Sequence, residues 1–353
     1  ITLGAATLSD GVTLTVGTGI GNALSLSSVT GTAGATASNL TINTTGTVTV
    51  SGAVGTDIGT VTITQSGGTT FSSTVDAATV TLTDTADNAN ITFNGALTAT
   101  TLSTATQGYN VAINAGGTIT NAVTFSNTGT VTLGDASGDS ITFTGGVTAT
   151  APSQVNIAGT VQSTNTAISI GDSGTPIVLN ANATISAGSG DITLGGTVNG
   201  GSTLTLNTTG TTTLSGIIGG STALTSLTTN SGGTVAINTT AITTTGAQTF
   251  GENATLGANT TLTTSNGNIS FGGTISNTSA QNLTFNTGTG TVSVTGAVGS
   301  GTALGTITLT QTGGATFTST VNAATVTLTN TTGTITFNGA LTATTLSTAT
   351  QGY

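Results

Sequence analysis

The chain has 353 residues, 54 of them glycine, and it contains no Lys, Arg, His, Cys, Met or Trp. The missing side chains exclude thiol and imidazole catalysis and cationic phosphate clamps. The ten acidic residues give a formal net charge of -10, which removes the electrostatic basis of nucleic-acid binding. We therefore expect neither an enzyme nor a nucleic-acid-binding protein, and the sequence offers no catalytic, metal-binding or cofactor-binding residue.

Short strand-like segments recur from the N-terminus onward. They alternate Val, Ile, Leu or Phe with Thr, Ser or Ala over three to five positions, and Gly, Asn or Asp separates them. ITF at Ile91, VAI at Val111 and VTL at Val131 begin twenty residues apart. Alternation indicates half-buried strands, and a fixed spacing indicates a repeat architecture. The sequence predicts an all-β chain folded as a parallel β-helix, or β-solenoid, with about 20 residues per coil.

The aromatic and amide residues have expected places in such a coil. The nine phenylalanines should fill the interior, because most of them lie in strand triplets such as ITF. Asn94, Asn114 and Asn338 lie at turns, where Asn tolerates left-handed conformations and can form amide ladders between coils.

A long repeat contains these coils. ITFNGALTATTLSTATQGY occupies residues 91–109 and returns at residues 335–353, an offset of 335 - 91 = 244. The similarity extends backwards, because residues 47–83 match residues 291–329 with small insertions in the loops. We interpret 1–353 as one continuous β-solenoid window: 1–109 is a partial repeat copy, 110–248 is the remainder of the unit, and 249–353 starts the next copy.

Two acidic pairs are the only candidates for a cation site or a carboxylate pair. Asp84 and Asp87 lie in TDTADNAN, and Asp135 and Asp139 lie in GDASGDS. Calcium takes six to eight oxygen ligands, which neither cluster supplies. Capping of turns is the favoured interpretation, and we predict no metal site and no glycosidase pair.

Two other architectures fit parts of the pattern. A string of β-sandwich domains also shows short, regularly spaced strands, but its loops would alternate in length and its core would need an aromatic anchor. Silk-like cross-β stacking is the second alternative. The short and uniform spacing favours the solenoid.

The repeats GDITLGGTV at Gly190 and GNISFGGTI at Gly267, together with the Thr, Gly and Asn bias and the lack of cysteine, resemble a known family. They are similar to the filamentous-haemagglutinin-like exoproteins of two-partner secretion and to giant bacterial surface proteins built from β-strand repeats. The resemblance covers the whole window and implies a right-handed β-helix that extends from a bacterial cell surface. No secretion-domain motif is present to carry over.

The expected function is a non-enzymatic extracellular structural protein: a surface fibre, sheath or adhesin stalk. Its expected partners are further copies of itself, in a filament, bundle or sheet, and a host or neighbouring cell surface. We expect no membrane insertion, because no apolar run reaches the roughly 18 residues of a membrane helix. The chain begins and ends inside repeats, so we expect more chain on either side.

The alternative is an ice-binding or carbohydrate-binding β-solenoid. The recurring T-x-T arrays resemble those on the flat β-helix faces of some antifreeze proteins, and this resemblance implies ice binding. Interruptions by Ser, Ala, Asn and Val, and coil lengths that vary between nineteen and twenty-four residues, argue against it. N-x-[ST] sequons such as those at Asn39, Asn253 and Asn282 also permit glycosylation, which the sequence does not decide.

Overall fold

The computed structural model describes residues 1–349, and within them it contains strands and turns but no helix. The predicted repeat at residues 335–353 thus ends in four residues, 350–353, that lie outside the described part. Contacts divide the chain into two compact units, Ile1–Asn180 and Ala181–Tyr353. The boundaries predicted from the repeats, after residues 109 and 248, are sequence boundaries of another kind and stay predictions.

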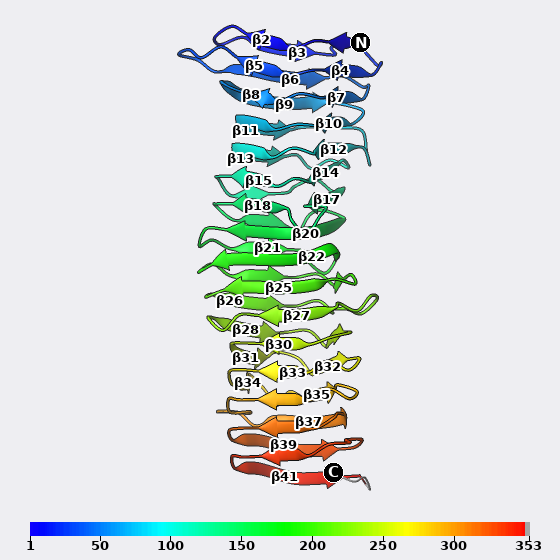
Figure 1. Cartoon of the computed structure of the whole chain (residues 1–353), viewed down its shortest axis with the longest axis vertical. Coiled ribbons are helices and arrows are strands. Elements are labelled where there is room, and N and C mark those ends of the chain that lie inside the picture. The colour runs from blue at the N-terminus through cyan, green and yellow to red at the C-terminus, as the bar shows by residue number, and fades with distance from the viewer. Residues whose placement is uncertain (350–353) are drawn as a thin grey trace. The chain divides into compact units, whose positions relative to one another are not determined.

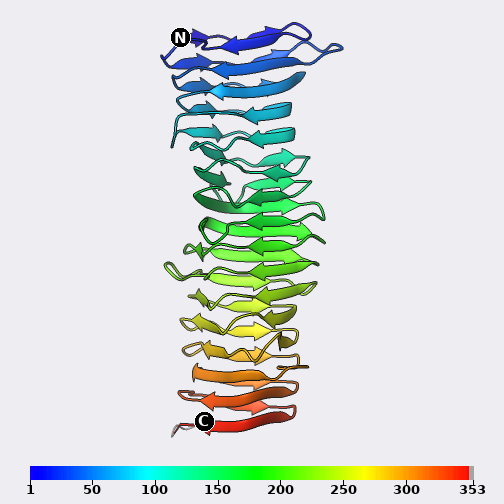
Figure 2. The ribbon, with the colours of Figure 1, turned by 180° about the vertical axis from the view of Figure 1, so that it is seen from behind.

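Each unit is a β-solenoid of parallel strands, and the coils lie roughly 21 residues apart. The all-β fold class and the coil length of about 20 residues are therefore confirmed, whereas β-sandwich domains, which pack antiparallel sheets, do not describe the structure. Figures 1 and 2 show the strands of each unit lying one above another, coloured blue to green in the first unit and green to red in the second.

The strands of the first unit are mostly three to eight residues long. They are β1 (Thr2–Leu3), β2 (Ala6–Leu8), β3 (Thr13–Val16), β4 (Leu24–Leu26), β5 (Val29–Gly31), β6 (Ser38–Asn43), β7 (Val48–Val50), β8 (Val54–Gly55), β9 (Ile58–Gln65), β10 (Thr69–Phe71), β11 (Val75–Leu82), β12 (Asn90–Phe93), β13 (Leu97–Thr104), β14 (Asn110–Ile113), β15 (Gly117–Ile119), β16 (Val123–Thr124), β17 (Thr130–Leu133), β18 (Ser140–Phe143), β19 (Val147–Ala149), β20 (Gln154–Ser163) and β21 (Ile168–Ile170).

The strand β22 contains the residues at which the two units meet in the sequence, and the other strands below belong to the second unit. They are β22 (Ile177–Gly188), β23 (Ile192–Leu194), β24 (Val198–Asn199), β25 (Thr203–Thr208), β26 (Thr211–Leu214), β27 (Ser226–Thr229), β28 (Thr234–Ile237), β29 (Ala241–Thr244), β30 (Gln248–Phe250), β31 (Asn253–Leu256), β32 (Thr260–Thr264), β33 (Ile269–Phe271), β34 (Ile275–Asn277), β35 (Leu283–Asn286), β36 (Val292–Val294), β37 (Leu304–Gln311), β38 (Ala315–Phe317), β39 (Val321–Leu328), β40 (Ile335–Phe337) and β41 (Leu341–Thr348).

Each coil of the first unit contributes to three stacks of parallel strands. The first stack runs β1–β4–β7–β10–β12–β14–β17–β20. The second runs β2–β5–β8–β11–β13–β15–β18–β20. The third runs β3–β6–β9–β11–β13. The long strands β11 and β13 take part in both the second and the third stack.

The second unit repeats this scheme. Its first stack runs β22–β25–β27–β30–β33–β36–β38–β40, and its second runs β23–β26–β28–β31–β34. Its third runs β29–β32–β35–β37–β39–β41. The third stack is the one that carries the candidate site in both units.

The interior consists of apolar columns that run from coil to coil. Alternation along each strand buries every second residue, as in β12, where Ile91 and Phe93 are buried and Thr92 between them faces outward. Phe71 and Phe93 stack with ring centroids 5.0 Å apart and an interplanar angle of 5°. Eight of the nine phenylalanines are buried, as predicted; Phe337 is half-buried. The amide ladder is confirmed where Asn114 Nδ2 donates to Asn94 Oδ1 at 2.9 Å.

Candidate functional site

The outward face of the third stack carries two parallel columns of small polar side chains in each unit. We call these residues the hydroxyl array. In the first unit it comprises Asn39, Thr41, Thr60, Thr62, Thr79, Thr81, Thr101 and Ser103. In the second unit it comprises Asn282, Thr284, Thr306, Thr308, Thr325, Thr327, Thr345 and Ser347.

The array forms because each of its strands presents two outward residues on either side of one aliphatic residue, which is buried in every strand of the array except β41, where Leu346 is exposed. In β9, Val61 is completely buried, whereas Thr60 and Thr62 are half-buried and face outward. The same pattern holds in β11 around Val80. Since successive side chains of a strand point to opposite faces, a buried residue in the middle fixes its two neighbours on the outer face.

Backbone pairing keeps the columns in register. Thr41 pairs with Thr62, Thr62 with Thr81, and Thr81 with Ser103. In the second unit, Thr284 pairs with Thr308, Thr308 with Thr327, and Thr327 with Ser347. Each column therefore repeats at the strand spacing of about 4.8 Å, while the two columns lie about 6.6 Å apart, two residues along a strand.

The variable coil length does not disturb this register. From Thr41 to Thr62 there are 62 - 41 = 21 residues, from Thr62 to Thr81 there are 19, and from Thr81 to Ser103 there are 22. The turns between strands absorb the differences, as at Thr56 and Asp57, whose φ angles are 52° and 64°. Varying coil length, one of the two sequence-based arguments against a regular T-x-T array, therefore does not disturb the register of these four coils; the other argument, interruption by residues such as Asn39 and Ser103, still applies.

Most hydroxyls of the array have no hydrogen-bond partner within the described part of the protein. The exception is Thr101, whose Oγ1 accepts a hydrogen bond from Asn121 Nδ2 at 2.9 Å. Hydroxyls at the buried corners behave differently: Ser66 Oγ and Thr85 Oγ1 lie 2.9 Å apart, and Thr69 Oγ1 donates to Ser66 Oγ at 3.0 Å. The array thus directs its hydrogen-bonding capacity away from the protein.

The array is the same in the two copies of the repeat, whereas some other positions differ. All eight array residues of the first unit have an identical counterpart in the second. In contrast, the buried Val61 and Ile63 become Ile307 and Leu309. Two outward residues of the other stacks also differ between the copies, because Thr49 corresponds to Ser293 and Asp76 to Asn322, whereas Thr70 and Thr316 are the same.

The acidic pairs found in the sequence are not assembled into a site. The Asp139 carboxylate accepts hydrogen bonds from the backbone N–H groups of Asp135, at 2.9 Å, and of Ala136, at 2.7 Å. This is the turn capping that the sequence favours. Asp84 and Asp87 follow β11 in a loop. Within residues 1–349, no three His, Cys, Asp or Glu side chains gather where they could hold a metal ion.

One acid is buried in the second unit. Glu252, the sole glutamate, is 3% exposed, and Thr229 Oγ1 donates a hydrogen bond to its Oε2 at 2.6 Å. Burial raises the pKa of this carboxyl, and the hydrogen bond from Thr229 partly opposes the shift. Sequence reasoning missed this residue, because FGEN is typical of an exposed turn.

Tyr109 is a second buried titratable residue. Its phenol donates to the carbonyl of Leu82 at 2.7 Å and accepts the N–H of Ala105 at 2.9 Å. Burial raises the pKa of Tyr109 to about 12, so the phenol stays protonated and holds two neighbouring coils together.

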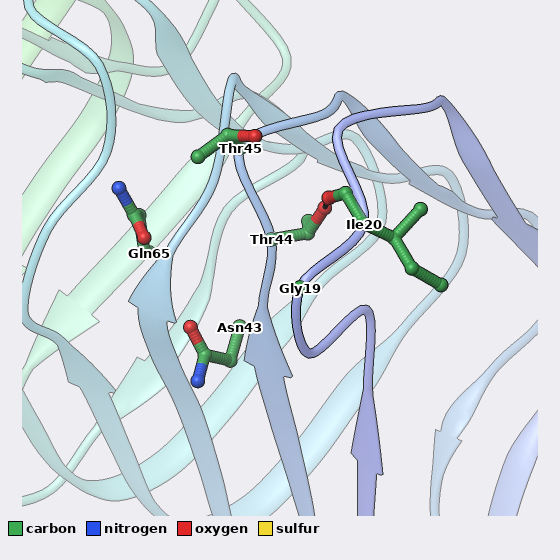
Figure 3. Close-up of a pocket in the computed structure, with 6 residues that line it drawn as sticks. All are labelled: Gly19, Ile20, Asn43, Thr44, Thr45 and Gln65. Atoms are coloured by element: carbon green, nitrogen blue, oxygen red, sulfur yellow. Dashed lines mark hydrogen bonds between the residues drawn. The ribbon is translucent and has the colours of Figure 1, made fainter.

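A small pocket lies near the start of the first unit (Figure 3). Its lining residues are Gly19, Ile20, Asn43, Thr44, Thr45 and Gln65, and its volume is about 90 Å³. Thr44 Oγ1 already donates to the carbonyl of Ile20 and accepts the N–H of Gly46. The pocket is smaller than the roughly 300–1,000 Å³ of typical ligand sites, and its most buried hydroxyl is occupied.

Within residues 1–349, no helix is long and apolar enough to cross a membrane. No protein-family model, curated protein or solved structure matches the chain.

Proposed function

We propose that the chain is a non-enzymatic structural segment of an extracellular protein, which forms a surface fibre, sheath or adhesin stalk. The observation that carries the proposal is the parallel backbone pairing of successive coils, which persists through all three stacks of each unit. A solenoid of this kind gains length by adding coils, because each coil contacts only its neighbours.

The interior supports a stiff element. Apolar side chains stack above one another, and Phe250 and Phe271 lie 4.5 Å apart between ring centroids in the second unit. Outside the core, Asn side chains bind the next coil: Asn268 Oδ1 accepts the N–H of Thr291 at 2.9 Å. Bending such a stack would require the stretching of backbone, core and side-chain contacts together.

Length provides the direct test. The comparison is between the chain itself and a tandem version with one additional 244-residue repeat. The addition supplies roughly 12 coils at a spacing of about 21 residues, or ~55 Å of rod at 4.8 Å per coil. Electron microscopy should show particles lengthened by about this amount at constant width. Particles that grow in all dimensions would contradict a structural rod.

Self-association and surface location belong to the same proposal. The outward side chains are mainly uncharged, and the chain lacks the lysines that often protect strand edges from pairing. We expect the chain to form filaments, bundles or sheets at high concentration, which sedimentation velocity measures.

The surface location has its own test. Antibodies raised against the chain should label intact cells of the source organism; label that appears only after lysis would contradict the surface location.

A further inference from the structure

The hydroxyl array presents an uncharged, two-dimensional pattern that is fixed by the backbone. We propose that this array binds ice. The proposal does not rest on the structural role above, because a short particle with the same face would bind equally.

The geometry is the first argument. The columns repeat every ~4.8 Å along the stack, and alternate residues are ~6.6 Å apart along the strand. Both spacings are close to oxygen–oxygen repeats of the ice lattice. Backbone pairing fixes the position of each strand (each rung of the stack) relative to the next, as Thr60 with Thr79 and Thr62 with Thr81 show.

Complementarity of charge and hydrogen bonding is the second argument. A water lattice is uncharged and offers both donors and acceptors, and a Thr hydroxyl can serve as either. The Oγ1 atoms of Thr41, Thr62 and Thr81 have no partner in the described protein, and each side chain also carries a methyl group that orders water without competing for hydrogen bonds. A charged side chain would instead hold its own hydration shell.

The difference between the stacks is the third argument. In the first stack the outward residues change in kind from strand to strand: β10 presents Thr70, whereas β14 presents Asn110 and Ala112. Ala112 therefore interrupts the column of hydroxyls that Thr70 and Thr92 form in this stack. Among the described strands, those of the third stack combine two columns over four rungs in both repeat copies, and their eight array positions are identical between the copies.

A second copy of the chain is the competing occupant. Two arrays could face each other, because neither carries a charge. Binding between copies needs no particular match to the ice lattice, however, whereas ice requires the regular two-dimensional spacing that the four rungs provide. The experiment therefore measures both ice binding and association.

The test compares the full chain with two double variants of equal charge. Thr62→Lys/Thr308→Lys places an ammonium group in each array, and Thr70→Lys/Thr316→Lys places one in the first stack of the same coils. Each protein is partitioned into slowly growing ice, and the gap between its freezing and melting points is recorded. Circular dichroism and urea unfolding establish that each variant is folded.

We expect the unmodified chain to enter ice, the array variant to enter about tenfold less, and the first-stack variant to match the unmodified chain. A third variant, Thr81→Val/Thr327→Val, keeps shape and β propensity while it removes two hydroxyls; it should bind ice less well and remain folded.

Exclusion of the unmodified chain from ice would overturn the proposal. Equal losses in both Lys variants would do the same, as would sedimentation showing that the array lysines abolish self-association without changing ice partitioning.

Discussion

Glu252 is a buried carboxyl in a chain that has no cationic side chain to pair with it. Because burial raises its pKa in the folded state, the folded protein holds this proton more tightly than the unfolded chain. The favourable contribution of Glu252 to the free energy of unfolding is therefore complete below the unfolded pKa of about 4.3, and it is lost as the pH rises through the higher folded pKa.

Glu252→Gln should remove this loss. We expect the variant to be more stable than the unmodified chain at pH 7, by about 1–2 kcal/mol, and nearly equal to it at low pH, because the neutral amide keeps an acceptor for Thr229. Urea unfolding across this pH range measures the effect. Asp76→Asn is the control, since Asp76 is exposed and corresponds to Asn322 in the other copy. A parallel pH dependence in all three proteins would refute the assignment.

Thr56 adopts a backbone conformation that a β-branched residue seldom takes. Its φ is 52° and that of Asp57 is 64°, whereas the corresponding loop of the second copy has Gly299 and Gly301 at φ 70° and 86°. A non-glycine residue in the left-handed region costs roughly 1–2 kcal/mol.

Thr56→Gly should therefore stabilise the first unit by about 0.5–1 kcal/mol, after allowance for the greater freedom of Gly in the unfolded chain. Thr83→Gly, at an exposed position of ordinary φ, should destabilise it slightly. Chemical denaturation of both variants provides the comparison, and the idea fails if the two substitutions have the same sign.

The two repeat copies provide a matched pair of strands. Phe93 in β12 and Phe337 in β40 lie in identical sequence, but Phe93 is completely buried and Phe337 is half-buried. Truncation of a buried aromatic residue costs about 3–5 kcal/mol. We expect Phe93→Ala to approach this loss and Phe337→Ala to show about half of it, as measured by urea unfolding. Equal losses would mean that burial in the stack does not determine the cost.

Insertions should have a small effect on stability in turns and a large effect in strands. Because the turns absorb coil lengths of 19 to 22 residues, addition of Ser-Gly after Asp57 should change stability by less than about 1 kcal/mol. One Ala inserted between Val80 and Thr81 shifts every later side chain of β11 to the opposite face. We expect that variant to lose cooperative unfolding. A tolerated strand insertion would show that register is weakly specified.

Local alternation was sufficient to predict which residues of most strands are buried. Val48 and Val50 face inward and Thr49 outward, as the letters VTV indicate. The position of one coil over the next was harder to predict, because it depends on turns whose length changes while the strand register does not. The array at Thr41, Thr62 and Thr81 was for this reason only partly visible in the sequence.

The sequence also did not predict which polar residues face inward. Glu252 and Tyr109 are buried because a neighbouring coil supplies a hydroxyl or a carbonyl partner, and such partners lie 23 and 27 residues away along the chain. Short-range pattern cannot identify a partner at that distance. A single glutamate among nine aspartates is the only sequence signal that singles out position 252.

Charge acts at the scale of the whole molecule, because all ten ionisable side chains that carry charge at neutral pH are acidic. Every interaction between them is repulsive, both within one chain and between copies. Dissolved salt screens such repulsion beyond about 10 Å at 0.1 M, and protonation of the carboxylates removes it. Both changes should therefore favour compact, associated chains.

We expect self-association to increase with salt at pH 7 and to increase further as the pH falls toward the isoelectric point of about 4.1. Sedimentation velocity at low ionic strength and at ~0.15 M salt provides the measurement. A variant in which five exposed aspartates are replaced by asparagine should associate at neutral pH and low salt as the unmodified chain does near pH 4. Association that weakens with added salt would require opposite charges in the contact, which the side chains do not provide, and would contradict this account.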